Sequence, residues 1–259
     1  TGGIEQFDAI WVSSLTDSLA KGKPDIELID RSSRFATINE ILEATTNPLI
    51  FDGDTGGHPE HFIYTVRTLE RLGVSGIVIE DKNGLKRNSF YERPNEHRQE
   101  DIKLFSAKIR AGIEARIHDQ FMIIARIESL ILGKGQKDAI NRAQAYLDAG
   151  ASAIMIHSKD KSGDDIKQFT NAYNKLGNRK PLMLIPTSYN RCSEQELSGW
   201  GANIIVYANH LLRASYPAMR RVAEIILKSH RALEAEDLCV PIEDFVKIIP
   251  EPKAYAKRK

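Results

Sequence analysis

The sequence is poor in cysteine, in net charge and in long apolar segments. Cys192 and Cys239 are the only cysteines in 259 residues. They have no zinc-type spacing, so we expect neither a disulfide framework nor a structural zinc site, and a reducing cytoplasm is favoured. The net charge of +1 gives no general attraction to nucleic acid or to an anionic membrane. No apolar run approaches the roughly 20 residues of a membrane span. We therefore expect a cytoplasmic protein that binds neither nucleic acid nor membrane, in which local charge must hold any anionic ligand.

Seven short apolar segments rich in valine and isoleucine are present instead, separated by stretches with helical periodicity. Each segment is nearly continuous in apolar residues, which is typical of a parallel sheet covered on both faces. Between them, stripes such as Phe62, Val66, Leu69 and Leu72 predict amphipathic helices. This alternation predicts a parallel α/β fold. The predicted strands are Phe7–Ser13, Pro48–Asp52, Gly76–Asp81, Phe121–Glu128, Ala153–His157, Leu182–Thr187 and Ile204–Ala208.

Polar residues gather at the carboxyl ends of these predicted strands. In a closed barrel those ends ring one mouth, where active sites are built. An open doubly wound sheet does not bring all of them together, and it usually carries a glycine-rich loop that this sequence lacks. We therefore expect a (β/α)8 TIM-type barrel forming a single domain over residues 1–259. The residues at the strand ends are Asp52, Glu80, Asp81, Arg126, Glu128, His157, Ser158, Thr187, Asn209 and His210.

Seven strands are one fewer than a complete barrel needs. We expect the first βα unit to be missing from this sequence, upstream of Thr1; the alternative is an overlooked strand near Ile26–Ile29. Residues 82–100 are too long and too polar for an ordinary connection, and we expect them to form a lid loop on the catalytic face. From about residue 213 to residue 259, a helical stripe followed by prolines predicts a C-terminal helical extension.

Acidic residues at neighbouring strand ends suggest a metal site. Asp52 and Asp54 flank Gly53, which lets the chain turn sharply, and Glu80 and Asp81 end the next strand. Several carboxylates at one edge of a sheet repel one another, and a hard cation such as Mg²⁺ relieves that repulsion. Alternatively, these acids cap the following helices or pair with lysine and arginine.

Basic and polar residues at other strand ends suggest an anion site. Arg126 lies inside an apolar strand, where a guanidinium without an anion is costly. Its partner is either a carboxylate, such as Glu128 two residues along on the same side, or an anionic substrate. His157, beside Arg126, is a candidate for a phosphoryl or carboxylate contact. Three donors in the predicted lid can close on an anion, namely Lys86, Asn88 and Ser89.

The run from Glu80 to Ser89, EDKNGLKRNS, resembles the signature EDK-x-x-x-K-x-N-S of the phosphoenolpyruvate mutases, which belong to the isocitrate lyase superfamily. The lyases of that superfamily carry a catalytic cysteine in the loop after this strand. Residues 82–100 contain no cysteine, which disfavours a lyase. The resemblance runs in order from Trp11 to Arg213. Its other matching segments are Trp11–Leu15, Asp25, Asp52–Asp54, Ala125–Glu128, Ile156–Ser158, Pro186–Thr187 and Ala208–His210.

The resemblance implies an enzyme that interconverts phosphoenolpyruvate and phosphonopyruvate by intramolecular phosphoryl transfer, in phosphonate biosynthesis. It implies that Mg²⁺ binds directly to Asp52, with Asp25, Asp54 and Glu80 holding the water shell. Homodimers or homotetramers that exchange a C-terminal helix are also implied. The implied catalytic residues are Asp25, Lys86, Asn88, Ser89, Arg126 and His157.

The same resemblance implies how the substrate is held. The carboxylate would lie against Ser13 and the backbone near Ser14 and Leu15, with Trp11 in the same pocket. The phosphoryl group would be gripped by Arg126, His157 and Asn88, while Lys86 helps to shut the lid.

Two other functions stay open at this point. Phosphonopyruvate hydrolase shares nearly all these residues but transfers the phosphoryl group to water. The resemblance gives the mutases asparagine at position 88 and the hydrolase threonine, and this chain has Asn88. From another class, a catalytically dead barrel could serve as a binding or assembly subunit, although an intact carboxylate set argues against it.

Overall fold

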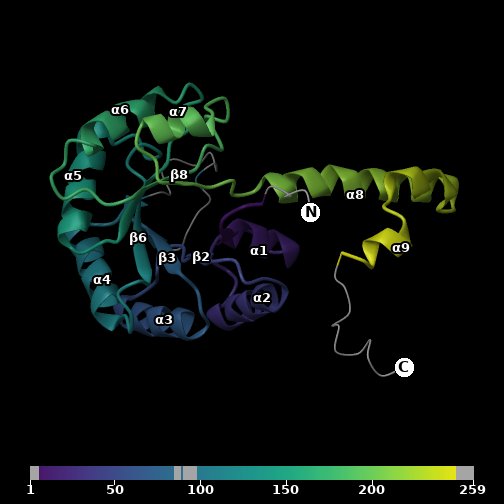
Figure 1. The fold of residues 1–259 in the computed structure, drawn as a ribbon, viewed down its shortest axis with the longest axis horizontal. Coiled ribbons are helices and arrows are strands. Elements are labelled where there is room, and N and C mark those ends of the chain that lie inside the picture. The colour runs from purple at the N-terminus through teal and green to yellow at the C-terminus, as the bar shows by residue number, and fades with distance from the viewer. Residues whose placement is uncertain (1–5, 85–88, 90–97, 249–259) are drawn as a thin grey trace. The chain divides into compact units, whose positions relative to one another are not determined.

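The computed structural model describes residues 6–84, 89 and 98–248. Seven parallel strands form one curled sheet whose spatial order follows the chain, and helices cover its outer face (Figure 1). This confirms the expected TIM-type α/β fold. Each strand is shorter than predicted, and most end before the residues that follow them in the prediction, although Asp52 ends β2 and Glu80 ends β3. The strands are β1 (Ile10–Val12), β2 (Leu49–Asp52), β3 (Gly76–Glu80), β6 (Met122–Ile127), β7 (Ala153–Ile156), β8 (Leu182–Leu184) and β9 (Ile204–Ile205).

The sheet starts at β1 and finishes at β9. Among the described residues, β1 pairs with β2 alone and β9 with β8 alone. The alternative of an overlooked strand near Ile26–Ile29 is wrong. The amide of Ile26 donates to the carbonyl of Pro24 at 3.0 Å, and Glu27 has a left-handed φ of 59°, which an extended strand does not contain. An eighth strand from residues before Thr1 stays a prediction.

Side chains along each strand alternate between the two faces of the sheet. Ile77 and Ile79 point outward into the main core under the helices, whereas Val78 points inward with Ile124, Met155 and Met183. The inner position that follows Val78 is Glu80, which pairs in register with Arg126. The same alternation places His157 and Asp52 on the inner side. The inner face therefore carries an apolar floor with a polar layer at its carboxyl edge.

The helices pack their apolar stripes against the outer face of the sheet. Phe62, Val66 and Leu69 of α3 are fully buried, as the stripe predicted. The helices α3 and α4 approach closely, since a Cβ at Gly112 would lie 2.4 Å from a ring carbon of Phe62. The helices that accompany the sheet are α1 (Ser14–Ala20), α2 (Arg31–Ala44), α3 (Pro59–Arg71), α4 (Ile102–Ala115), α5 (Gly135–Asp148), α6 (Asp164–Tyr173) and α7 (Glu194–Gly199).

A short antiparallel ribbon closes the base of the segment that was predicted to be a lid. It joins β4 (Lys82–Asn83) to β5 (Arg98–Gln99), with Lys82 opposite Gln99. Most of the segment between the two strands, including Lys86 and Asn88, lies outside the described residues. The sequence did not indicate this ribbon, because two-residue strands carry no readable periodicity.

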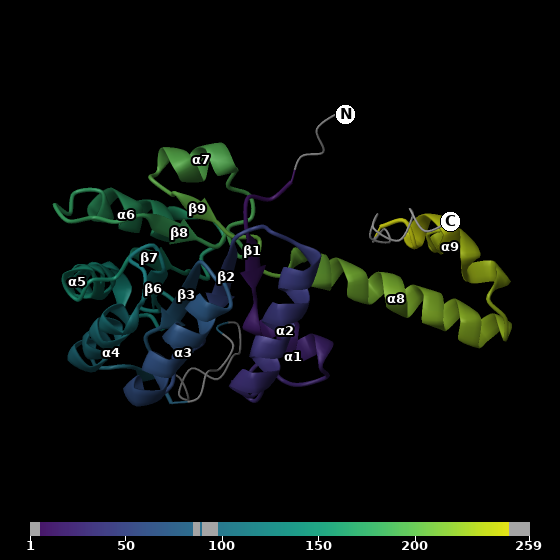
Figure 2. The same ribbon diagram turned by 60° about the horizontal axis from the view of Figure 1, so that its bottom comes forward.

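The chain divides into two compact units, residues 1–209 and 210–259. The second unit contains α8 (His210–Ser229), η2 (Leu233–Leu238) and α9 (Ile242–Phe245). The helix expected after Arg213 thus begins at His210 and continues through Pro217 (Figure 2). Among the described residues, no helix combines the length and the hydropathy needed to cross a bilayer.

Candidate functional site

A pocket of about 60 Å³ opens at the carboxyl ends of the strands. The carboxyl ends of all seven strands, or the segments that follow them, supply its walls, as expected for a barrel mouth. Carboxylates, a guanidinium, an imidazole and hydroxyl groups all face this small volume. Its lining residues are Trp11, Ser13, Leu15, Asp25, Asp52, Ser89, Arg126, His157, Ile185, Thr187, Ala208 and Asn209.

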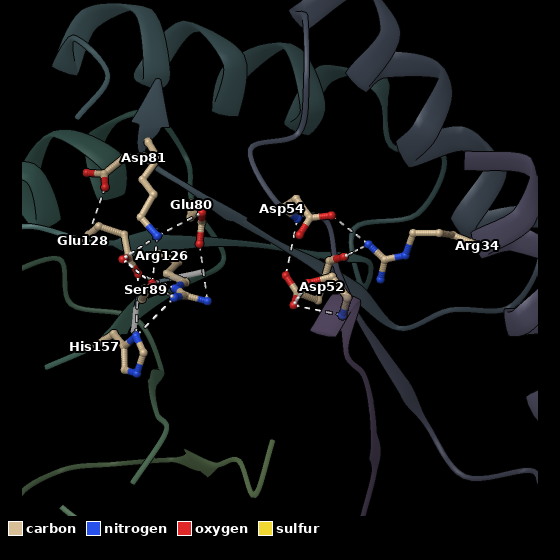
Figure 3. Close-up of polar contacts among 11 residues, drawn as sticks. Arg34, Asp52, Asp54, Glu80, Asp81, Ser89, Arg126, Glu128 and His157 are labelled. Carbon is tan, nitrogen blue, oxygen red and sulfur yellow. Dashed lines mark hydrogen bonds and ion pairs between the residues drawn. The ribbon is translucent and has the colours of Figure 1, made fainter. Parts of the chain in front are cut away.

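Two groups of charged side chains meet at this pocket (Figure 3). We call Asp25, Asp52, Asp54, Ser14 and Arg34 the carboxylate half. The cation half lies at the ends of β3, β6 and β7. It consists of Glu80, Lys82, Ser89, Arg126, Glu128 and His157.

Asp52 is the last residue of β2 and is held by the first turn of α1. Its Oδ2 accepts from the Ser14 hydroxyl at 2.7 Å and from the Ser14 amide at 3.2 Å. Ser13 caps α1 by accepting from the Thr16 amide at 3.2 Å, and its hydroxyl proton stays available to a ligand. The Ser14 amide was expected to face a substrate carboxylate but donates to Asp52 instead. Leu15, one residue further along, lines the pocket.

Arg34 of α2, only 5% exposed, reaches under the ends of β1 and β2. Its Nη1 donates to the Asp52 carbonyl at 2.7 Å and to Asp54 Oδ2 at 3.0 Å, and its Nη2 donates to the Val12 carbonyl at 3.3 Å. The guanidinium also stacks on the Phe51 ring, 4.2 Å from the ring centroid. Sequence reasoning missed this residue, because α2 carries only a weak apolar stripe and its partners are distant in the sequence.

The turn after β2 works differently from the prediction. Gly53 is not in a left-handed conformation; it is needed because a Cβ there would lie 2.6 Å from Ile77 Cδ1 and 2.9 Å from the Val78 carbonyl oxygen. Its amide donates to that carbonyl at 2.8 Å. The left-handed residue is Asp54, with φ of 54°. Glycine here therefore permits close strand approach, and the aspartate makes the turn.

Arg126 is the centre of the cation half. Its Nε donates to Glu128 Oε1 at 2.5 Å, and its Nη2 donates to Ser89 Oγ at 2.9 Å. Its Nη1 lies 3.4 Å from Glu80 Oε2. Burial alone would lower the pKa of Arg126, but the charges of Glu128, Glu80 and Asp52 outweigh burial and raise it. The predicted pairing of Arg126 with Glu128 is present, and Arg126 also lines the pocket.

Glu128 and Lys82 complete this half beneath the pocket. Glu128 Oε2 accepts from Ser89 at 2.9 Å and lies 3.0 Å from Lys82 Nζ, while Lys82 also lies 3.3 Å from Glu80 Oε1. Burial would raise the pKa of Glu128, but Arg126, Lys82 and His157 hold it well below its usual range. Lys82 was not predicted as a site residue, although its place directly after the strand end was the available signal.

His157 presents a neutral ring to the pocket. Burial lowers its pKa, and the charges of Arg126 and Lys82 lower it further against the opposing effect of Glu128. Its Nδ1 lies 3.1 Å from Arg126 Nη2 and 3.8 Å from Glu128 Oε1. Because arginine can only donate, the nearer contact makes Nδ1 an acceptor and leaves the ring proton on Nε2. Neutral His157 can therefore donate one hydrogen bond through Nε2.

Asp81 does not belong with the site carboxylates. Its Oδ2 accepts from Tyr146 at 2.7 Å, Gln99 at 3.0 Å and Arg142 at 3.1 Å, and its Oδ1 accepts from the Glu128 amide at 2.9 Å. Burial raises the pKa of Asp81 to about 6, against the opposing charge of Arg142. The alternation of β3 explains the outcome, since Glu80 follows the inner residues and Asp81 the outer ones.

The donor set fits a hard divalent cation at the carboxylate half. Among the described residues, no three acidic, imidazole or thiol groups converge closely enough to share an ion. Mg²⁺ needs only one or two carboxylates, because it keeps most of its water. Buried Asp25 and Asp52 both offer oxygens to the pocket. Three carboxylates (Asp25, Asp52 and Asp54) against one guanidinium (Arg34) give a formal charge of −2, which a divalent ion balances.

The structure brings most of the predicted site residues to one place. Glu80 and Asp54 do not line the pocket. Glu80 contacts Lys82 and Asp54 contacts Arg34, which agrees with the alternative that these acids pair with lysine and arginine. Thr187 and Asn209, noted in the sequence as strand-end residues and as part of the resemblance but given no role, line the wall. Lys86 and Asn88 lie outside the described residues. The predicted residues in the lining are Trp11, Ser13, Leu15, Asp25, Asp52, Ser89, Arg126 and His157.

Comparison with known proteins gives consistent matches over most of the chain. A family model described as phosphoenolpyruvate phosphomutase matches residues 3–227. The chain is 34% identical to phosphonopyruvate hydrolase from Variovorax sp. (strain Pal2), over 93% of this chain and 83% of that protein. It is 32% identical to phosphoenolpyruvate phosphomutase from Tetrahymena pyriformis, over 93% of this chain and 80% of that protein.

Solved structures give the same two activities. A crystal structure of phosphoenolpyruvate phosphomutase from Streptomyces platensis subsp. rosaceus is similar with a TM-score of 0.87 at 35% identity, covering 93% of this chain and 83% of that one. A phosphonopyruvate hydrolase in complex with oxalate and Mg²⁺ is similar with a TM-score of 0.84 at 33% identity, covering 93% and 82%. These values show the family but do not separate the two activities.

Proposed function

The chain belongs to the phosphoenolpyruvate phosphomutase family, and from that premise we propose that it interconverts phosphoenolpyruvate and phosphonopyruvate with Mg²⁺ as cofactor. The reaction moves a phosphoryl group between oxygen and carbon of one substrate, so it is an isomerisation that forms or breaks a carbon–phosphorus bond. The observation that carries the proposal is the pocket itself, in which Asp25 and Asp52 face Arg126 and His157.

The carboxylate half suits the pyruvyl end of this substrate. Mg²⁺ bound by Asp52, with Asp25 on its water shell, would supply a positive charge for the substrate carboxylate and the adjacent oxygen. Ser13 offers its hydroxyl proton, and Leu15 lies in the first turn of α1, where amides have no helical acceptor. Trp11 closes the side of the pocket. We propose that these residues orient the carboxylate and the enolate oxygen.

The cation half suits the phosphoryl end. Of the Arg126 contacts, that of Nη1 with Glu80 is the longest, so Nη1 is the group that a phosphoryl oxygen can take over most readily. Neutral His157 donates through Nε2 to a second oxygen, and Asn88 is proposed to donate to a third. Phosphoryl transfer passes through a loose transition state in which positioned donors matter more than covalent help.

Water exclusion decides between transfer within the substrate and hydrolysis. The phosphoryl group must stay beside the substrate until carbon or oxygen recaptures it, and a water molecule in the pocket would intercept it. Asn88 offers two N–H donors and more bulk than threonine, so we propose that it holds the group and occupies the space of that water. Asn88 therefore favours the mutase reaction.

Phosphonopyruvate hydrolysis is the second candidate function. The observation that favours it is the 34% identity to the Variovorax hydrolase, slightly above the 32% identity to the Tetrahymena mutase. A difference this small carries little weight, because the residues of the pocket are compatible with either reaction.

Phosphorus NMR of the purified protein with phosphonopyruvate and Mg²⁺ tests the proposal. We expect the phosphonate signal to convert to that of phosphoenolpyruvate, with little inorganic phosphate, and the conversion to stop in excess chelator. Inorganic phosphate with pyruvate from the first time points would replace the mutase by the hydrolase. No conversion at all, by protein that binds Mg²⁺, would favour a non-catalytic barrel.

We also propose that the chain forms homodimers or homotetramers. The support is α8, none of whose side chains is buried and which exposes Leu211, Tyr216, Met219 and Leu227. Such apolar exposure is typical of an interface. Light scattering after size exclusion should give a mass of two or four chains; a mass of one chain would contradict this.

A further inference from the structure

The side chain of Arg34 connects four elements of the carboxylate half. Its contacts are with the last carbonyl of β1 at Val12, the last carbonyl of β2 at Asp52, and the Asp54 carboxylate in the turn after β2. Its Nε also lies 3.5 Å from Asp17 Oδ2 on α1. Each of these four partners lies within two residues of a residue that lines the pocket. Arg34 itself does not line the pocket.

We propose that Arg34 is a positioning residue for the divalent cation, acting by fixing the orientation of Asp52 and of the first turn of α1. The inference rests on the proposed function only in taking Asp52 as a ligand of the ion. Arg34 does not touch substrate or ion in this arrangement; it sets where the Asp52 carboxylate points.

The geometry requires a guanidinium and not merely a positive charge. Parallel strands end at their carboxyl edge with carbonyls that the ladder no longer pairs, and Arg34 donates to one such carbonyl from each of two strands. A planar fork can span both strands while it also meets Asp54, whereas an ammonium is a single point. The Phe51 ring stacks on the Arg34 guanidinium and keeps its plane in place, with Cζ of Arg34 4.2 Å from the ring centroid. Fixing the ends of both strands fixes the distance between Ser14 and Asp52, which are joined by two hydrogen bonds.

Neighbouring cations cannot replace Arg34. Lys21, whose side chain is 32% exposed, reaches Asp17 at 2.6 Å, and its other contacts are with Ser33 and Thr37 of α2 rather than with β1 or β2. Arg31 lies one turn earlier on the same helix and donates to the carbonyls of His61 and Gly56 at 3.3 and 3.4 Å. Arg31 thus makes the same kind of contact without meeting a site carboxylate, which makes it a matched control.

Direct metal binding tests the proposal independently of turnover. Mn²⁺ binding to the 259-residue chain would be followed by electron paramagnetic resonance, with Mg²⁺ as competitor, in the wild type, Arg34→Lys and Arg31→Lys. Residues that orient a ligand typically change metal affinity by about 10- to 100-fold, so we expect the Kd to rise by that factor in Arg34→Lys. We expect Arg31→Lys to bind as the wild type does. Circular dichroism would confirm that each variant is folded.

If Arg34→Lys cannot be purified folded, Phe51→Leu takes its place, since it keeps the guanidinium but removes its stacking surface. We expect the Kd to rise by about three- to fivefold in Phe51→Leu. Wild-type Kd values in the folded Arg34→Lys variant, or in Phe51→Leu where it is the substitute, would overturn the inference. An equal loss of affinity in Arg31→Lys would also overturn it, because the effect would then belong to α2 as a whole.

Failure of this inference is distinguishable from failure of the proposed function. Wild-type protein that binds Mn²⁺ but does not turn over phosphonopyruvate would contradict the mutase and leave Arg34 testable. Wild-type protein that binds no Mn²⁺ would overturn the role of Arg34 and the metal assignment together, while any turnover by that protein would still identify the reaction.

Discussion

The two halves of the pocket differ in how their charges are balanced. In the cation half, Arg126 and Lys82 face Glu80 and Glu128, so two formal positive charges meet two negative ones at distances of 2.5 to 3.4 Å. In the carboxylate half, Arg34 is the one cation among the residues named above and stands with three carboxylates, one of which, Asp52, also acts on Arg126 of the other half. The cation half is therefore complete without a ligand, whereas the carboxylate half has an excess negative charge that a bound cation would relieve.

This difference teaches that the same residue types can serve stability in one half and binding in the other. A buried pair that is broken leaves an uncompensated charge, so the cation half should be needed for folding. Removing one carboxylate from a half with excess negative charge should cost folding little but should weaken binding of the ion. Substitutions in each half can break this comparison.

Asp52→Ala should have the largest effect on activity and a small effect on folding. Loss of the direct ligand should remove the ion and reduce turnover by at least about 1000-fold, since a bound cation supplies several kcal/mol of transition-state stabilisation. The measurement is turnover by phosphorus NMR together with Mn²⁺ binding. Retained turnover in Asp52→Ala, or undiminished turnover by the wild type in excess chelator, would contradict the metal assignment.

Glu128→Gln should have the opposite profile, with a large effect on folding. The variant leaves Arg126 and Lys82 with one negative partner fewer, and we expect the free energy of unfolding to fall by about 3–5 kcal/mol. Urea denaturation followed by circular dichroism measures this. Because the pKa of Glu128 lies well below its usual range, its contribution is present above about pH 4.5 and is lost as pH falls through the folded pKa. A loss under 1 kcal/mol at pH 7 would show that the two halves do not differ in this way.

Asp81→Asn should give the smallest of the three effects and should depend on pH. Burial raises the pKa of Asp81 from 3.8 to about 6, so the folded state disfavours the charged form. The contribution of Asp81 is therefore greatest below about pH 4 and declines by roughly 3 kcal/mol as pH rises to 6 and above. Asp81→Asn should lack this decline, so the difference between wild type and variant should change between pH 4 and pH 7.

Asp138→Asn is the control for the Asp81 experiment. Asp138 contacts the same Arg142 at 2.9 Å, but its side chain is 31% exposed. We expect the free energy of unfolding of Asp138→Asn to change with pH in the same way as that of the wild type between pH 4 and pH 7. A pH-independent difference between the wild type and Asp81→Asn would refute the raised pKa of Asp81.

The fold could be predicted because a parallel sheet covered on both faces requires apolar runs, and such runs can be recognised in the sequence. A parallel strand buried on both faces is a nearly continuous apolar run, and Ile77–Ile79 of β3 and Met122–Ala125 of β6 show this plainly. The strand ends carrying Asp52, Arg126 and His157 were readable for the same reason. Strand parity would also have separated Glu80 from Asp81, and this signal was available in the alternation of Ile77, Val78 and Ile79 but was not used.

The supporting residues could not be predicted from local patterns. Arg34 lies 18 and 22 residues from the carbonyls to which it donates, and nothing in α2 marks it as different from Arg31. Lys82 and Glu128 are 46 positions apart in the sequence, and they are in contact because β3 and β6 are neighbours in the sheet. Such contacts are consequences of tertiary packing, so they become visible only when the fold is known.

The position of each half in the sheet has a consequence for local opening. The cation half is built on β3, β6 and β7, the middle strands, whereas Ser13 and Ser14 follow β1 and Asp52 ends β2, at one end of the described sheet. Amide groups in central strands exchange with solvent deuterium mainly on global unfolding, while strands at an end also open locally. Over the described residues β1 pairs with β2 alone, so in the 259-residue chain the ion-binding side should open locally while the anion-binding side remains intact. Hydrogen exchange would then slow in β1 when the ion binds, at a place the ion does not touch.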